Sequence, residues 1–416
     1  MTAPLSIEIN EQALQAEIDH LASISECPGP AVTRILFSEV DQQGRDYVKG
    51  LCAAAGLELR HDPVGNIFGR WQGSDDSLKP IGSGSHIDAI PNAGRYDGVV
   101  GVLGFIEAVR ALQRAGFQPR RTMELIIFTA EEPTRFGLGC LGSRMLAGSL
   151  SSAQVGALRD KEGKSLDELR LGAGIDGDLG TVRLLPGAYE AFVELHIEQG
   201  PLLEMEDLPI GIVEKIAGPS TLHAVITGTG GHAGAVLMPV RHDALLAAAE
   251  LALAVEKAAL ESGSPDTVAT TGVFTIEPGA VNSIPCSATL EIDLRDTNLA
   301  ARGRTQEHIE MAAGQIAHKR GVQIKTSLFN ADPPAIADAK LVETVEQVCQ
   351  DLAIPSKRMI SRAYHDSLFM AQVCPTTMIF IPCLRGYSHR PDEYSSPEQI
   401  KTGVKVLASV LAKLAG

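Results

Sequence analysis

The chain has 416 residues, which at about 150 residues per domain predicts two or three domains. Hydrophobic residues make up 44% and charged residues 21%, a globular composition that excludes disordered, collagen-like and coiled-coil classes. The net charge of -15 repels a phosphate backbone and an anionic bilayer, and the most apolar stretch, residues 244–259, is shorter than the roughly 20 residues that span a membrane. We therefore expect no nucleic-acid partner and no membrane role.

The seven cysteines are an odd number without a CxxC pair, so they indicate neither a disulfide framework nor a thiolate zinc site. They fit a reducing compartment, and the first residues lack the basic and apolar segments of a secretory signal. We expect a cytoplasmic protein.

Helices and strands alternate through the first part of the chain. Apolar residues at helical spacing predict two helices before residue 55, and the turn at residues 63–66 predicts a hairpin. A strand near residues 79–88, a helix over residues 99–115 and a buried strand at residues 123–129 follow. This alternation predicts an α/β fold.

The pattern changes between residues 217 and 325, where a strand, an alanine-rich helix and two further strands occur. Helix and strand patterns like those of the first part return after residue 326, and chemistry-bearing motifs lie on both sides of the segment. We therefore expect one domain formed by residues 1–216 and 326–416, with residues 217–325 inserted as a smaller domain.

The densest polar cluster is GSHID at residues 84–88, followed by AGRYDGVVG. His86 and Asp88 share one side of an extended chain, so the carboxylate can orient the imidazole. Asp97 opens the next helix. Taken alone, His86 is better explained as a hydrogen-bonded histidine at a strand end, and Asp97 as a helix N-cap.

Further acids and histidines follow other strands. Glu131 and Glu132 come directly after the buried strand, His196 lies in ELHIEQGP, and His389 follows the strand TTMIFIP. Open α/β sheets place their active sites at the carboxyl ends of strands, although the two glutamates can also be a solvated pair. Three histidines, an aspartate and a glutamate form a ligand set that suits zinc or manganese, with nickel or cobalt also possible.

These motifs, in this order, resemble the amidohydrolase and carbamoylase branch of the M20 metallopeptidase family. The resemblance rests on GSHID with AGRYDG, EEPTRFGLGCLGSRMLAG, ELHIEQGP, GGHAGAVLMPVRHDA and SHRPDEYSSPE, and it extends from about residue 30 to residue 405. It implies a catalytic α/β domain with a mixed sheet flanked by helices and an inserted α+β lid domain that also forms a homodimer. It further implies two divalent metal ions.

The resemblance assigns a role to each motif residue of the catalytic domain. Asp97 bridges the two ions, with His86 and His196 on one ion and Glu132 and His389 on the other. Glu131 is the general base, Asp88 supports His86, and Gln199 lines the ureido pocket.

The resemblance also assigns three residues of the lid. His232 reaches the site of the partner subunit, while Asn282 and Arg295 hold a substrate carboxylate. From the sequence alone, His232 is equally a solvated residue of a glycine-rich turn, Asn282 is a turn residue, and Arg295 can pair with a neighbouring aspartate.

Tyr387 in RGYSHRPDEYSSPE, together with Pro133 and Thr134 after the acid pair, is most similar to the ureidoglycolate amidohydrolase subgroup. A phenol there can hydrogen-bond a substrate hydroxyl or carboxylate, and a packing tyrosine is the alternative. The resemblance thus implies hydrolysis of a linear ureido or carbamoyl C–N bond in a small carboxylate, with ureidoglycolate first. N-carbamoyl amino acids, including the β-ureidopropionase substrate, and allantoate are the alternatives. A peptidase, a deacylase and an inactive metal-binding protein fit the motifs less well.

Overall fold

The computed structural model describes residues 6–416 and divides into two compact units. The larger unit contains the chain up to Glu214 together with Ile336–Met359 and His365–Gly416, and the smaller unit contains Lys215–Ala335 and Ile360–Tyr364. The expected limit at residue 325 falls inside a strand, β14 (Gln323–Ala331), which pairs with β9 (Gly218–Thr227). The smaller unit extends to Ala335 because this strand belongs to its sheet.

A nine-stranded mixed sheet forms the centre of the larger unit, in the order β15-β8-β17-β7-β4-β6-β3-β2 with β16 beside β8. β17, β7, β4 and β6 run parallel to one another, whereas β3 runs antiparallel to β2 and β6, and β8 runs antiparallel to β17. The strands are β2 (Glu58–His61), β3 (Ile67–Trp71), β4 (Ile81–His86), β6 (Met123–Phe128), β7 (Ala191–Ile197), β8 (Ile210–Ile216), β15 (Ala335–Ile336), β16 (Ser356–Ser361) and β17 (Thr376–Ile381). A separate ribbon pairs β1 (Val32–Arg34) with β5 (Ala89–Ala93).

The central strands are buried on both faces, which fits the sequence of β6, where every residue except Glu124 is apolar. Leu125 and Ile127 face one hydrophobic cluster, and Ile126 and Phe128 face another. Layers of helices cover both clusters. The helices of this unit are α1 (Glu11–Ser23), α2 (Glu39–Ala54), α3 (Val99–Arg114), α4 (Leu141–Ala147), α5 (Ser152–Ala157), α6 (Leu166–Gly172), α7 (Leu202–Met205), α10 (Ala339–Asp351), α11 (Ser367–Met370) and α12 (Pro397–Ala415), with 3-10 turns η1 (Leu179–Thr181) and η3 (Leu384–Gly386).

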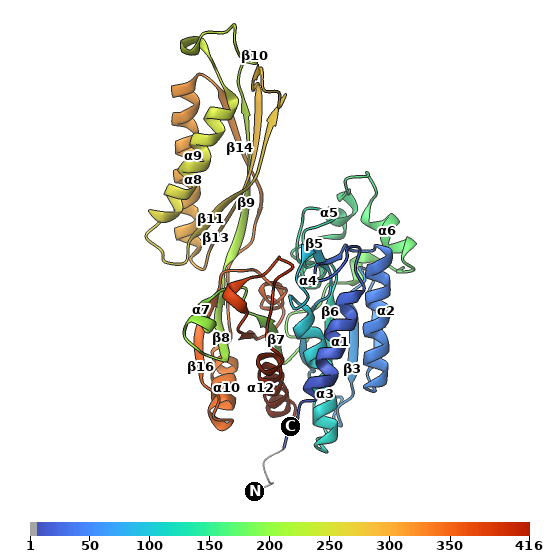
Figure 1. The fold of residues 1–416 in the computed structure, drawn as a ribbon. Helices are drawn as coiled ribbons and strands as arrows, with labels where there is room; N and C mark the ends of the chain where they lie inside the picture. The colour runs from blue at the N-terminus through green and yellow to red at the C-terminus, as the bar shows by residue number, and fades with distance from the viewer. Residues whose placement is uncertain (1–5) are drawn as a thin grey trace. The chain divides into compact units, whose positions relative to one another are not determined.

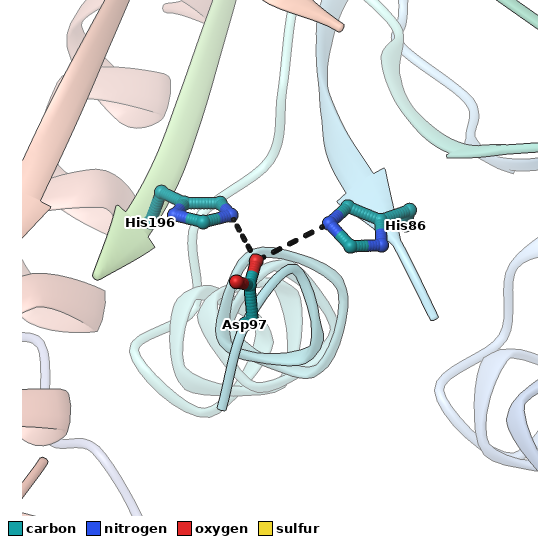
Figure 2. A group of neighbouring side chains, drawn as sticks. All are labelled: His86, Asp97 and His196. Carbon is teal, nitrogen blue, oxygen red and sulfur yellow. Dashed lines mark ion pairs between the residues drawn. The ribbon is translucent and has the colours of Figure 1, made fainter. Parts of the chain in front are cut away.

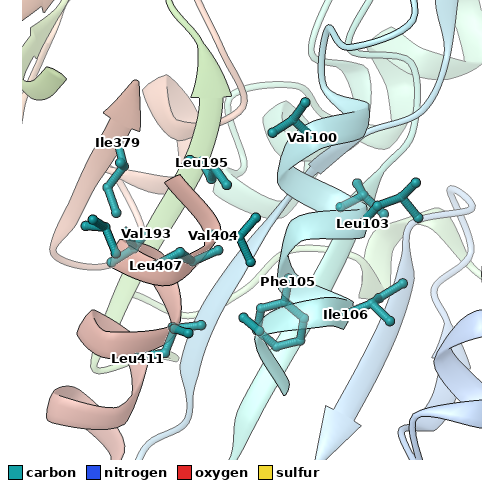
Figure 3. Close-up of a cluster of buried hydrophobic side chains, with 14 of the residues drawn as sticks. Val100, Leu103, Phe105, Ile106, Val193, Leu195, Ile379, Val404, Leu407 and Leu411 are labelled. Carbon is teal, nitrogen blue, oxygen red and sulfur yellow. The ribbon is translucent and has the colours of Figure 1, made fainter. Parts of the chain in front are cut away.

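The main core lies where α3 and α12 pack on one face of the sheet (Figure 3). Val100 and Leu103 of α3 belong to the same cluster as Val404 of α12 and Leu195 of β7. α12 begins with a capping box, in which Ser396 and the side chain three residues later satisfy each other's backbone N–H groups. This packing fixes the sheet whose strand ends carry the polar motifs.

The smaller unit is an antiparallel sheet, in the order β11-β13-β9-β14, with two helices on one face (Figure 1). Alternate residues of β13 are buried against those helices, as expected for a sheet with one covered face. The remaining elements are β10 (Gly231–His232), β11 (Val268–Glu277), β12 (Ser283–Ile284), β13 (Ser287–Asp296), α8 (Ala244–Leu260), α9 (Leu299–Arg320) and the 3-10 turn η2 (Met238–Val240). The two units confirm the predicted fold class, an α/β domain with a mixed sheet and a smaller α+β domain.

Among residues 6–416, no helix has both the length and the apolar character that a membrane span requires.

Candidate metal and catalytic site

The predicted polar motifs of the larger unit meet at one edge of its sheet. β17, β7, β4 and β6 are parallel neighbours, so their carboxyl ends lie together. His86 ends β4, Glu131 and Glu132 follow β6, His196 lies near the end of β7, and His389 comes after β17. Topology alone therefore brings these residues together, as the sequence predicted for an open α/β sheet.

The first group consists of His86, Asp97 and His196, all buried (Figure 2). Asp97 Oδ1 lies 3.4 Å from His86 Nε2 and 3.1 Å from His196 Nε2. Asp97 precedes α3 but does not cap it, since the capping position is Gly98. Gly98 has a φ of 67°, and a Cβ there would lie 2.4 Å from His86 Nε2. Glycine at this position thus allows the imidazole to stand against the start of the helix.

The second group consists of Asp97, Glu132 and His389. His389 Nε2 lies 3.4 Å from Asp97 Oδ2 and 3.3 Å from Glu132 Oε1. The two oxygens of Asp97 therefore face different groups, one each. The histidine is half-exposed, whereas both carboxylates are buried.

The imidazoles are oriented for binding through Nε2. His86 Nδ1 lies 3.0 Å from the carbonyl oxygen of Asp88, and His196 Nδ1 lies 2.9 Å from the carbonyl oxygen of Ile197. A carbonyl only accepts, so the Nδ1 atoms donate and the Nε2 atoms face Asp97. His86 Nε2 is buried without a hydrogen-bond partner. Buried imidazole nitrogens that face carboxylates fit a cation, and the two groups together provide the nitrogen and oxygen donors that zinc or manganese prefers.

The buried histidines and carboxylates of this site shift one another's pKa values. Burial lowers the pKa of His86, but the Glu131, Asp88 and Asp97 carboxylates outweigh it and raise that pKa well above its usual value. Hydrogen bonds to Asp97 and Glu132 raise the pKa of His389 to about 11. Burial opposes ionisation of Asp97, yet the three neighbouring histidines outweigh it and hold the pKa of this carboxyl well below its ordinary range.

Glu131 stands beside these groups, with Oε2 3.7 Å from His86 Nε2. Burial raises its pKa well above the ordinary value, and the charges of Glu132, Asp366 and Asp97 raise it further. A carboxyl that holds its proton more firmly than usual is a suitable proton carrier at the site.

Asp88 positions the acid pair as well as His86. Its carboxylate lies 3.5 Å from His86 Nδ1, and it accepts the backbone N–H groups of Glu131 and Glu132 at 3.3 and 3.1 Å. The sequence pointed to the contact with His86 only, because the backbone of a distant loop leaves no trace in the spacing.

A third cluster, Glu194, His196 and His365, also has the composition of a metal site. Both oxygens of Glu194 already accept hydrogen bonds, Oε1 from Ser85 Oγ at 2.7 Å and Oε2 from Ser367 Oγ at 2.6 Å. His365 packs edge-on against the ring of His196. This cluster therefore supports the ring of His196 through its contact with His365.

Three side chains, those of Gln199, Ser388 and Glu393, form a network around Asp97, and the sequence pointed only to Gln199. Gln199 donates to Asp97 Oδ2 at 2.6 Å, and Ser388 Oγ donates to the same oxygen at 2.7 Å. Glu393 Oε1 accepts the N–H groups of Tyr96 and Asp97 at 2.8 and 3.1 Å. Ser388 and Glu393 belong to the motif SHRPDEYSSPE, so the motif itself was the available signal.

The predicted residues of the smaller unit lie at two different ends of its sheet. β10, with His232, pairs with β12, and the carbonyl of Asn282 accepts the N–H of Ala233, so His232 and Asn282 are neighbours. Arg295 is the ninth residue of β13, about 26 Å from its first residue at about 3.3 Å per residue. It bonds to the carboxylate of Asp293, and its guanidinium lies over the ring of Tyr364.

Tyr387 of the larger unit makes a cation–π contact with Arg390, whose guanidinium carbon lies 3.8 Å from the centre of the tyrosine ring. This cation–π contact holds the ring against Arg390.

Comparisons with known proteins show what this chain is similar to. Residues 82–413 match the model of the peptidase family M20/M25/M40. A ureidoglycolate hydrolase from Arabidopsis thaliana is 53% identical, covering 98% of this chain and 87% of that protein. An N-carbamoyl-L-amino acid amidohydrolase from Geobacillus stearothermophilus is 35% identical over 98% of this chain and 99% of that protein. The crystal structure of AtUAH in complex with glyoxylate has a TM-score of 0.93 at 52% identity and covers 99% of both chains.

Proposed function

Because this chain belongs to the peptidase family M20/M25/M40, we propose that it is a metal-dependent amidohydrolase that cleaves a ureido C–N bond in a small carboxylate, ureidoglycolate first. One observation carries the reaction class: two adjacent ligand groups share Asp97 beside the buried carboxyl of Glu131. The substrate is supported by the ureidoglycolate hydrolase that is 53% identical across nearly the whole chain.

The two ligand groups are proposed to hold two divalent cations, zinc or manganese, with nickel or cobalt as alternatives. His86 and His196 would hold one, Glu132 and His389 the other, and Asp97 both, since each of its oxygens faces one group. When bound, such cations polarise a carbonyl oxygen and lower the pKa of a water molecule. The orphaned Nε2 of His86 supports this assignment.

Glu131 is proposed as the residue that accepts a proton from the attacking water and passes it to the leaving nitrogen. Its burial and its raised pKa support that role. Asp88 fixes the backbone of Glu131 and therefore sets the position of the carboxyl. Gln199, whose amide already donates to Asp97, would donate to the ureido group as well.

Residues of the smaller unit are proposed to complete the site. Arg295 would bind the substrate carboxylate through charge-assisted bonds, and His232 would donate to the oxygen that gains charge during attack. Asn282 and Arg295 lie at different ends of one sheet, so we propose that they reach one substrate from two subunits of a homodimer. Tyr387 is proposed to bond the hydroxyl or carboxylate of the substrate.

Hydrolysis of an N-carbamoyl amino acid or allantoate is the second candidate, favoured by the 35% identity to an N-carbamoyl-L-amino acid amidohydrolase. The chemistry at the C–N bond would be the same, and only the contacts to the rest of the substrate differ. We also propose a cytoplasmic location, which the seven unpaired cysteines support.

The function is tested with chelator-treated protein, assayed for ammonia release before and after addition of Mn²⁺ or Zn²⁺. The substrates are ureidoglycolate, allantoate, N-carbamoyl-alanine and N-carbamoyl-β-alanine, and a dipeptide is followed by an amine assay. We expect metal-dependent turnover that is fastest on ureidoglycolate. Preference for a carbamoyl amino acid would retain the reaction class and reject the substrate. Cleavage of the dipeptide alone would reject both, and a monomer on gel filtration would reject the shared site.

A further inference from the structure

His232 lies in a loop of the smaller unit that is held by several backbone hydrogen bonds. The loop spans residues 228–242 and is closed at its base by the N–H of Thr229, which donates to the carbonyl of His242 at 2.8 Å. β10 pairs with β12 on one side, and Ala233 N–H donates to the carbonyl of Asn282 at 2.9 Å. The carbonyl of His232 accepts the N–H groups of Ala235 and Val236. An exposed loop with this many internal bonds holds one shape.

The side chain of Arg241 donates hydrogen bonds to two backbone carbonyls of this loop. Its Nε and Nη2 donate to the carbonyl of Val236 at 3.1 and 2.9 Å, and Nη2 also donates to the carbonyl of Ala233. The two carbonyls belong to the turn that directly follows His232. A planar guanidinium reaches both carbonyls at once, whereas the point charge of a lysine reaches one.

The same turn selects a tautomer of His232. The backbone N–H of Gly234 donates to His232 Nδ1 at 3.0 Å. An amide N–H cannot accept, so Nδ1 carries the lone pair and the proton of the neutral ring sits on Nε2. A proton on Nδ1 would meet the N–H of Gly234 and break this hydrogen bond.

We propose that Arg241 is a positioning residue that folds the turn after His232 and thereby holds the imidazole as the Nε2–H donor. The inference rests on the proposed function for the use of that donor, which is to stabilise an oxygen that gains negative charge. A donor that is oriented before the reaction costs no reorganisation during it. Arg241 itself touches no reacting atom.

The tautomer is measurable without turnover. The protein has 11 histidines, so the full-length enzyme labelled with ¹⁵N-histidine gives a tractable long-range ¹H–¹⁵N spectrum, in which His232 is assigned by comparison with His232→Gln. We expect the Nε2–H form in the wild type. In Arg241→Met, the ratio of the Nε2–H form of His232 to its Nδ1–H form should fall about fivefold. This factor corresponds to the loss of one net hydrogen bond.

Kinetics provide the second readout. Arg241→Met should lower kcat by about 10- to 100-fold, short of the roughly 10²- to 10³-fold loss of a whole oxyanion donor, with KM and metal content near wild type. Arg241→Lys should recover part of the loss. Arg320→Met is the matched control, because Arg320 is a half-buried arginine of the same unit that binds Glu250 and should leave both readouts unchanged.

The outcomes separate the two proposals. An unchanged tautomer ratio in Arg241→Met overturns the inference, whether or not kcat falls. If Arg241→Met does not fold, the same comparison is made with Arg241→Lys, for which a wild-type ratio and rate are equally contrary. If the wild type turns over none of the ureido substrates but the ratio still responds to Arg241→Met, the proposed function fails and the positioning role stands.

Discussion

Replacing Glu393 by glutamine should change how the stability of the metal-free protein depends on pH. Glu393 is 4% exposed, it accepts hydrogen bonds from two backbone N–H groups, and its Oε2 lies 3.0 Å from Ser388 Oγ. Burial and then the charge of Asp97 raise its pKa to about 7 from an ordinary value of 4.5. Folding therefore favours the protonated form of this carboxyl.

The sign and size follow from linkage. A carboxyl whose pKa is raised on folding contributes its full stability below pH 4.5 and loses it as the pH rises through about 7. The loss in the free energy of unfolding is about 3 kcal/mol, at about 1.36 kcal/mol for each unit by which the pKa is raised. Glutamine has nearly the same shape and does not ionise. Relative to wild type, the free energy of unfolding of Glu393→Gln should therefore increase by about 3 kcal/mol between pH 4.5 and pH 7.5.

Urea unfolding after chelation, followed by tryptophan fluorescence, measures this difference. The protein has one tryptophan, Trp71, which lies in β3 and packs against Phe117, so the signal reports the larger unit. Asp392→Asn is the control, since Asp392 is exposed and its pKa is lowered by Arg390. Parallel pH curves for wild type and Glu393→Gln would refute the reasoning. Added divalent metal should shrink the difference, because it compensates the charge of Asp97.

Four further expectations follow from the proposed function. Gly98→Ala should lose bound metal, measured by atomic absorption, because its Cβ would lie 2.4 Å from His86 Nε2; wild-type metal content would contradict this. Glu131→Gln should lower kcat by about 10²- to 10⁴-fold at unchanged metal content, and a smaller loss would remove Glu131 as proton carrier. Arg295→Met should lower kcat/KM by about 10- to 100-fold for a carboxylate substrate, but not for its amide, in matched ammonia assays. Metal binding should release protons near pH 7, recorded by a pH indicator in weak buffer, because the pKa of His389 is about 11 without metal; no release would show that the site does not hold those protons.

The sequence predicted the larger unit well because its pattern is local. The mainly apolar β6 and the helix closed by Gly116 have patterns that identify them without knowledge of their neighbours. The acids that follow β6 and the histidine that ends β4 were then placed correctly at one sheet edge, because parallel strands share that edge. The limit at residue 325 was less exact, since only the pairing of β14 with β9 shows to which sheet that strand belongs.

Residues that support the site escaped prediction because their partners are distant in the chain. Glu393 lies 296 residues from Asp97, and Ser388 lies 291 residues from it. Neither spacing nor residue type indicates such a contact, and a glutamate before a tyrosine is equally a surface residue. The order of strands decides it: β17 lies beside β7 and β7 beside β4, so the loop after β17 meets the loop before α3. Once that order is known, the loop that carries His389 must contact the loop that carries Asp97. A buried acid in the loop of His389 can then accept hydrogen bonds from the backbone N–H groups of the loop of Asp97, as Glu393 does in the structure.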